Sequence, residues 1–80
     1  MKYCVYILEC ADGTFYIGST NNLSRRLHAH NAYKSGAHYT KIRRPVVLRY
    51  VETHKTRRNA LKREYALKQL TKREKLMLIA

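Results

Sequence analysis

Two tripeptides that each contain a tyrosine stand near the start of the chain, ten residues apart. They are Cys4-Val5-Tyr6 and Tyr16-Ile17-Gly18, and Arg26, His30 and Glu64 follow them. A tyrosine hydroxyl can accept or donate a proton, an arginine can bind two phosphate oxygens at once, and a carboxylate can hold a divalent cation. These side chains supply the groups that hydrolysis of a phosphodiester needs, provided that the fold brings them to one sheet face.

Both tripeptides lie on segments that favour β-structure. Residues 3–10 and 14–18 are rich in β-branched and aromatic side chains. Between them stands Ala11-Asp12-Gly13, which has the composition of a tight turn. We therefore predict two antiparallel strands joined by a short loop.

The length of this loop decides where the tyrosines point. A two-residue turn would place Tyr6 and Tyr16 on opposite faces of the sheet. A three-residue loop, with Gly13 left-handed in a bulge, would pair Cys10 with Thr14 instead. Both tyrosines would then share one face as diagonal neighbours, about 7–8 Å apart. The three-residue loop is our prediction.

A helix is expected to follow the second strand, over residues 23–31. Residues 19–22 are polar and suited to capping its start. At about 100° per residue, one stripe of this helix consists of Leu23, Arg26, Leu27 and His30. Arg25 points the opposite way. We therefore predict that Arg26 faces the sheet and that Arg25 is solvated.

The second half of the chain is expected to add one strand and two helices. A polar, basic connection over residues 31–44 leads to a strand at 46–52 and a helix at 56–70. Thr71 and Glu74 fit a capping box that begins a last helix. The inner stripe of the 56–70 helix is predicted to contain Ala60, Leu61, Glu64, Leu67, Lys68 and Thr71.

This order of elements predicts an α+β fold of the form ββα-loop-βαα. The sheet would be small, three-stranded and antiparallel, with helices flanking it. Eighty residues are enough for one domain with a modest core, so a single domain is expected over residues 1–80.

The charge of the chain points to a polyanionic partner. Seventeen Lys and Arg stand against five Asp and Glu, a formal net charge of +12. An acidic membrane surface is the rival, but no basic amphipathic segment with large apolar anchors stands out, and no apolar run is long enough to cross a bilayer. Nucleic acid is therefore the expected partner, and no membrane association is expected.

The two cysteines are expected to be free thiols. Cys4 and Cys10 would lie about 20 Å apart in one strand that rises about 3.3 Å per residue, whereas a disulfide needs Cα atoms within about 7 Å. Free thiols suit a reducing cytoplasm, which is the expected location.

Taken together, these residues resemble the GIY-YIG nucleases over residues 3–70. Cys4-Val5-Tyr6 stands where that family has Gly-Ile-Tyr, and Tyr16-Ile17-Gly18 is its second tripeptide unchanged. Residues 18–30 are similar to the family's helix segment. The family includes intron-homing endonucleases, an incision domain of excision-repair proteins and junction nucleases.

The resemblance implies a role for each candidate residue. Arg26 matches the catalytic arginine, and Glu64 matches the carboxylate that holds a single Mg²⁺ or Mn²⁺. One of the tyrosines, Tyr6 in preference to Tyr16, would accept the proton of the attacking water. His30 would relay a proton or bind phosphate. The function implied is a metal-dependent endonuclease that hydrolyses DNA, with structure-specific substrates in repair or recombination.

Other readings remain open at this point. A nucleic-acid-binding module that keeps the fold without useful catalysis is the main alternative, and backbone charge does not separate DNA, the favoured substrate, from RNA. Glu64 could also serve only as the partner of Lys68 in an i,i+4 ion pair. The small size leaves room for a protein partner that selects the target. Nucleic-acid backbone contacts are predicted for His38, Lys41, Arg43 and Arg44.

Overall fold

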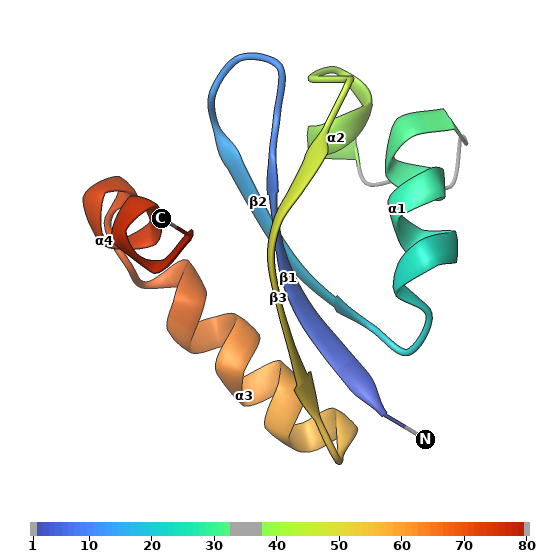
Figure 1. The fold of residues 1–80 in the computed structure, drawn as a ribbon, viewed down its shortest axis with the longest axis vertical. Helices are drawn as coiled ribbons and strands as arrows, with labels where there is room; N and C mark the ends of the chain where they lie inside the picture. The colour runs from blue at the N-terminus through green and yellow to red at the C-terminus, as the bar shows by residue number, and fades with distance from the viewer. Residues whose placement is uncertain (1, 33–37, 80) are drawn as a thin grey trace.

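The computed structural model describes residues 2–32 and 38–79. The elements in chain order are β1 (Tyr3–Glu9), β2 (Phe15–Thr20), α1 (Leu23–Ala32), α2 (His38–Lys41), β3 (Val47–His54), α3 (Arg57–Lys68) and α4 (Lys72–Ile79). The three strands form one antiparallel sheet in the order β2-β1-β3, so β1 is central and β2 is an edge strand (Figure 1). The predicted α+β architecture is confirmed.

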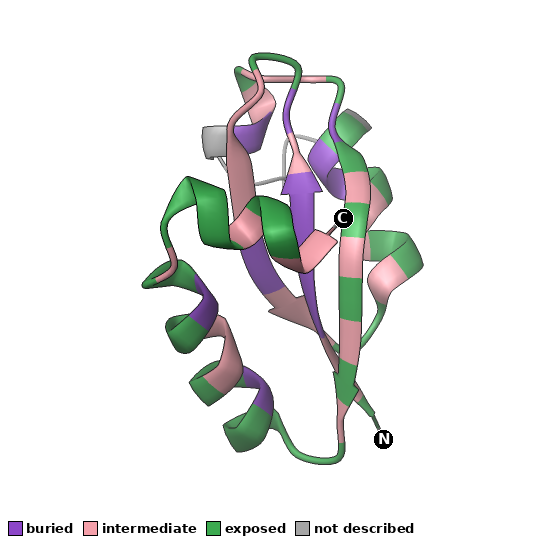
Figure 2. Cartoon of the chain, turned by 60° about the vertical axis from the view of Figure 1, so that its left-hand side comes forward, coloured by how far each residue is buried: buried purple, intermediate pink, exposed green. Residues whose placement is uncertain are grey.

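Helices cover both faces of the sheet. Val5, Ile7 and Ile17 turn to one face, where they pack against Ala60 and Leu67 of α3. Figure 1 shows α3 and α4 on one side of the sheet and α1 on the other. The strand β1 is purple along its middle in Figure 2 because its side chains are buried on both faces.

The second face carries a separate core under α1. Tyr6, Leu8 and Cys10 are buried there together with Val46, and Leu23 and Leu27 of α1 pack against them. Side chains alternate between the faces of a strand, so Tyr6 belongs to this face and its neighbours Val5 and Ile7 to the other.

The hairpin between β1 and β2 has the predicted three-residue loop. The Cys10 amide donates to the Thr14 carbonyl (2.8 Å), and the Gly13 amide donates to the Cys10 carbonyl (2.9 Å). Gly13 is left-handed, with φ of +82°. The register that follows pairs Tyr6 with Gly18 and Leu8 with Tyr16, as expected from the sequence.

Polar caps begin the three longer helices. The Asn22 side chain accepts a hydrogen bond from the Arg25 amide at the start of α1 (3.1 Å), and Thr56 caps α3 in the same way. At α4 the Glu74 carboxylate accepts from the Thr71 amide (2.9 Å) while the Thr71 hydroxyl accepts from the Glu74 amide (3.2 Å). The predicted capping box is confirmed.

Three details differ from the sequence prediction. The third strand continues to His54 because its last residues still pair with β1. The basic connection contains the short helix α2, which its sequence does not reveal. Leu61, Lys68 and Thr71 are exposed rather than part of the inner stripe of α3, because Ala60 and Leu67 supply the buried contacts.

Two further expectations concern cysteines and membranes. Cys4 and Cys10 are both free thiols, as predicted. Within residues 2–32 and 38–79, no helix has the length and apolar character required to span a bilayer.

The left-handed glycine in the hairpin gives a stability prediction. No atom lies within 4 Å of a Cβ added at Gly13, so Gly13→Ala changes only the backbone energy. An L-residue in the left-handed region costs about 1–2 kcal/mol, and we expect that loss in the free energy of unfolding measured with urea. Gly13→Asn should lose less, because asparagine tolerates this region. Equal stability of wild type and Gly13→Ala would contradict the left-handed conformation of Gly13, from which the three-residue loop and the strand register follow.

Candidate active site

The two tyrosines lie side by side over Gly18 on the α1 face of the sheet. A Cβ at position 18 would stand 2.5 Å from the Tyr6 hydroxyl oxygen, 2.8 Å from Tyr6 Cζ and 3.1 Å from Tyr16 Cε2. These distances are too short for a carbon atom. Gly18 therefore lets the Tyr6 ring lie across β2 toward the open edge of the sheet.

His30 of α1 lies against both tyrosine rings. Its ring centroid is 5.0 Å from that of Tyr16 and 5.9 Å from that of Tyr6. His30 is fully buried, and its Nε2 lies 2.9 Å from the Tyr6 hydroxyl. On the other side of the ring, Nδ1 lies 2.7 Å from Oγ1 of Thr40, which is also fully buried.

The donors around Tyr6 indicate which histidine nitrogen carries the proton. Arg26 is hydrogen-bonded to the Tyr6 hydroxyl, and a guanidinium can only donate. The buried Tyr6 O–H still needs an acceptor, and His30 Nε2 lies at hydrogen-bond distance. In the neutral ring the proton is then on Nδ1, which donates to Thr40. The Tyr6 hydroxyl proton and the His30 Nδ1 proton each then have an acceptor.

Burial sets the protonation states of this pair. Desolvation, followed by the charges of Arg26 and Arg44, lowers the pKa of His30 to about 4. Burial raises the pKa of Tyr6 to about 12, and the Arg26 hydrogen bond offsets only part of this effect. Both groups are therefore neutral near pH 7, and Tyr6 is not a tyrosinate before a substrate binds.

The two adjacent arginines of α1 differ as their helical phase predicts. Arg25 is exposed, whereas Arg26 is half-buried and reaches the Tyr6 hydroxyl. Leu23 and Leu27 hold this face of α1 against the sheet. The helix thus presents Arg26 and His30 to the tyrosines.

Glu64 does not share the sheet face of the tyrosines, so the condition that one face carries all the candidate groups is not met. Helix α3 packs on the opposite face, because its apolar residues Ala60 and Leu67 bury against Val5, Ile7 and Ile17. Glu64 Oε1 accepts a hydrogen bond from the Ser19 hydroxyl (2.7 Å), and Oε2 accepts from Lys68 Nζ (2.8 Å). The expected i,i+4 pair is therefore also present.

The edge strand β2 joins the two halves of the site. Gly18 underlies the tyrosines on one face, and the next residue, Ser19, binds Glu64 on the other. The Glu64 charge also contributes to raising the pKa of Tyr6, so it acts across this strand. Since no strand of residues 2–32 and 38–79 pairs with the outer side of β2, the two sets of groups are arranged around an open sheet edge.

Glu64 has the donor chemistry that a hard divalent cation prefers. Its side chain is 18% exposed, and carboxylate oxygens are typical ligands of Mg²⁺ and Mn²⁺. The described residues contain no cluster of three or more His, Cys, Asp or Glu side chains. A cation held by Glu64 would therefore take most of its ligands from water and substrate phosphate, which is how Mg²⁺ commonly binds.

The basic connection supplies structural contacts as well as charge. Arg44 donates to the carbonyls of Ala29 and His30 at the end of α1. Arg43 forms an ion pair with Asp12 of the hairpin loop (3.0 Å). The nucleic-acid contacts expected of Arg43, Arg44 and the half-buried Lys41 stay predictions.

His38 begins α2, but its side chain lies outside the described part of the chain. The nucleic-acid contact expected of it therefore also stays a prediction.

Comparison with known proteins identifies the chain. The model of the GIY-YIG catalytic domain matches residues 2–77. The chain belongs to the GIY-YIG family. The UPF0213 protein of Desulfotalea psychrophila is 53% identical over 75 residues, which cover 94% of this chain and 68% of that protein. The UPF0213 protein of Staphylococcus epidermidis is 50% identical over 78 residues, or 98% and 94% of the two chains.

Two solution NMR structures have the same fold. A UPF0213 protein from Bacillus halodurans is 39% identical, with a TM-score of 0.62 over 99% of this chain and 83% of that one. A protein from E. faecalis is 42% identical, with a TM-score of 0.65 over 98% and 83%. The chain thus matches most of the length of these relatives.

Sequence reasoning missed three residues of this GIY-YIG site. The spacing of the two tripeptides did not reveal the role of Gly18. A glycine within a strand is nevertheless a signal, because it often marks the close approach of another group. Strand alternation places Ser19 on the α3 face, so its contact with Glu64 had a detectable signal. Thr40 had none, because it reaches His30 from a connection without periodicity.

The depressed His30 pKa predicts acid sensitivity. The unfolded chain takes up a proton at this histidine as pH falls below about 6.5, whereas the folded protein does so only near pH 4. The free energy of unfolding should therefore decrease as the pH is lowered through this window, by up to about 1.4 kcal/mol per pH unit from His30. Above pH 7 the titration of His30 should not affect it. Urea unfolding as a function of pH tests this.

His30→Gln provides the control, since this variant lacks the titrating ring. Its stability should depend less steeply on pH between 4 and 6.5 than that of the wild type. The histidine signal that is present in the wild type and missing from this variant belongs to His30. An NMR titration of the wild type should give that signal a pKa near 4. A value near 6.5 would contradict the buried, neutral ring.

Proposed function

We propose that this chain is a metal-dependent endonuclease that hydrolyses DNA phosphodiesters. The observation that carries the proposal is the arrangement around β2, with Arg26 and the Tyr6–His30 pair on one face and Glu64 on the other. The net charge of +12 favours a polyanionic substrate. Membership of the GIY-YIG family supports the same reaction class.

In this proposal the substrate phosphate lies at the open edge of β2. Arg26 donates to its non-bridging oxygens and offsets the charge that develops in the transition state. Tyr16 is half-buried, and it orients the attacking water or the phosphate. A divalent cation held by Glu64 would supply Lewis-acid stabilisation of the phosphate and of the leaving oxygen.

Tyr6 and His30 accept the proton of the water together. A free phenolate is disfavoured because burial raises the pKa of Tyr6 to about 12. The Tyr6 oxygen instead takes the water proton while its own proton passes to His30 Nε2, 2.9 Å away. Water oxygen bonds to phosphorus, the ester bond to the leaving oxygen breaks, and His30 becomes an imidazolium.

Substrate binding favours this proton transfer. The guanidinium of Arg26 contributes to the low pKa of His30, and a bound phosphate would offset that charge. The ring is fully buried, so relaying a proton suits it and direct phosphate binding does not. Tyr6 is 2% exposed, which limits its substrate contact to a small group such as water.

The DNA would be selected by structure, as in repair or recombination. Backbone contacts do not read sequence. A flap, a junction or a single strand is therefore the proposed substrate, and a protein partner that selects the target fits the small size.

The matched arginines provide the first test. Purified protein should cleave labelled DNA with Mg²⁺ or Mn²⁺, and EDTA should abolish cleavage. Arg26→Ala should lower the rate about 100- to 1,000-fold, the usual cost of one transition-state donor, and Glu64→Gln should also remove most activity. Arg25→Ala should cleave like the wild type, since Arg25 is exposed and points away.

Equal activity of Arg25→Ala and Arg26→Ala would contradict the proposed role of Arg26 in binding the substrate phosphate. Binding of DNA without cleavage in either metal would support the alternative function, a nucleic-acid-binding module. Competition between matched DNA and RNA strands distinguishes the two substrates.

The shared proton relay predicts non-additive losses. Tyr6→Phe and His30→Gln should each lower the cleavage rate, by roughly 100- to 10,000-fold for loss of acid–base catalysis. The double variant should lose little more than either single variant, because both residues serve one transfer. Circular dichroism should first show that each variant folds. Losses that multiply would mean that the two side chains act independently.

A further inference from the structure

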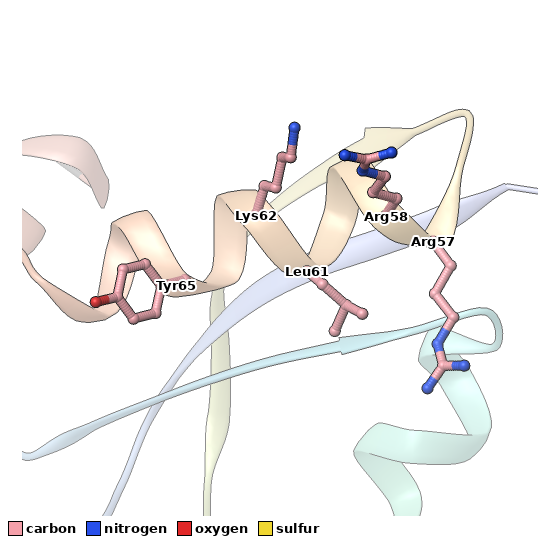
Figure 3. A pocket seen from close by; sticks show the side chains of 5 residues that line it. All are labelled: Arg57, Arg58, Leu61, Lys62 and Tyr65. Carbon is pink, nitrogen blue, oxygen red and sulfur yellow. The ribbon is translucent and has the colours of Figure 1, made fainter.

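Helix α3 has a surface that the proposed chemistry does not use. An open hollow of about 650 Å³ lies along its outer side, lined by Arg57, Arg58, Leu61, Lys62 and Tyr65. Figure 3 shows Arg58 and Lys62 on one side of the helix, Leu61 and Arg57 on the other, and Tyr65 toward its end. We refer to these five residues as the α3 platform.

The α3 platform combines an exposed aromatic ring with uncompensated positive charge. Tyr65 is 69% exposed and Leu61 is 46% exposed, although both are large apolar side chains. Across residues 2–32 and 38–79, Arg57, Arg58 and Lys62 take part in none of the ion pairs. Acidic side chains are absent from the lining.

We propose that the α3 platform binds an unpaired segment of nucleic acid, with a base stacked on Tyr65 and phosphates held by the three cations. The inference rests on the proposed function, whose substrate class it narrows. Grooves that bind single strands combine these two features, since every base has a face that can stack and every linkage carries a charge. In a duplex the bases already stack on one another.

The position of the platform favours nucleic acid over a protein partner. Arg57 also lines a second hollow of about 280 Å³ with Tyr3, Ser19, Thr20 and Asn21. Ser19 holds Glu64, which directly precedes Tyr65 on α3. A strand that stacks on Tyr65 can therefore follow the basic side chains of α3 as far as Arg57 and then pass uncharged polar residues at the open edge of β2.

The length of the platform fits a short stretch of strand. From Arg58 to Tyr65 the helix rises about 10 Å at 1.5 Å per residue. Arg58, Leu61, Lys62 and Tyr65 follow the i, i+3, i+4, i+7 pattern of one helix stripe. Cation and ring are thus neighbours, as binding one nucleotide through both its phosphate and its base requires.

The absence of tryptophan from the chain allows a direct test of stacking. The Tyr65→Trp variant should show indole fluorescence that short oligothymidylate quenches strongly and blunt duplex DNA quenches weakly. Met77→Trp is the matched control, because Met77 is 72% exposed on α4 and outside the platform. All titrations are made in EDTA, so that no cleavage is needed.

Binding affinities provide a second readout. Tyr65→Ala should weaken oligothymidylate binding in fluorescence anisotropy by roughly five- to a hundredfold, the usual loss of one stacked base, and Tyr65→Phe should restore it. Arg58→Ala with Lys62→Ala should lower the salt dependence of binding. Lys72→Ala with Arg73→Ala removes the same charge from α4 and should lower it less.

Three results would overturn the proposal. They are an unquenched Tyr65→Trp variant, equal quenching by single strand and duplex, and stronger quenching by an acidic peptide than by oligothymidylate. The third would identify a protein partner. If the wild type cleaves DNA and any of these three results is found, the α3 platform proposal is rejected and the proposed nuclease function is kept. Quenching and Tyr65-dependent binding without metal-dependent cleavage would instead reject the nuclease function and keep the platform.

Discussion

The close approach of the Tyr6 ring to the backbone of Gly18 is the constraint on which the rest of the site depends. A Cβ at that position would stand 2.5 Å from the Tyr6 hydroxyl oxygen, so only glycine allows the ring to cross β2. Once the ring lies there, its hydroxyl meets Nε2 of His30 and the guanidinium of Arg26. The bulged loop at Gly13 sets the register that makes this pairing.

Burial then decides what chemistry this arrangement can perform. A buried phenol and a buried imidazole each lose solvation when charged, which raises one pKa and lowers the other. Either group alone would be a poor base near neutral pH. Joined by a hydrogen bond, they can move a proton without leaving a charge on Tyr6, and an incoming phosphate can offset the charge of Arg26 beside them.

The sequence predicted most of the fold and the α1 side of the site. Loop length and strand alternation were enough to place Tyr6 and Tyr16 together, and helical phase separated Arg26 from Arg25. The face covered by α3 could not be derived in this way. Periodicity shows which side of a helix is apolar, but not which side of a two-faced sheet it covers, and Glu64 was assigned to the wrong face for this reason.

A site divided between two faces of a sheet needs an edge strand, and this requirement connects the catalytic groups with the α3 platform. If β2 were an interior strand, a further strand on its outer side would separate the Tyr6 face from the Glu64 face. Around β2 the two faces meet at an open edge, where a phosphate can contact groups from both. Arg57 lines both the hollow along α3 and the hollow beside β2, so a strand bound to the α3 platform can reach that edge past Arg57. The layout that assembles the proposed catalytic groups is therefore also the one that the proposed unpaired, flexible substrate requires.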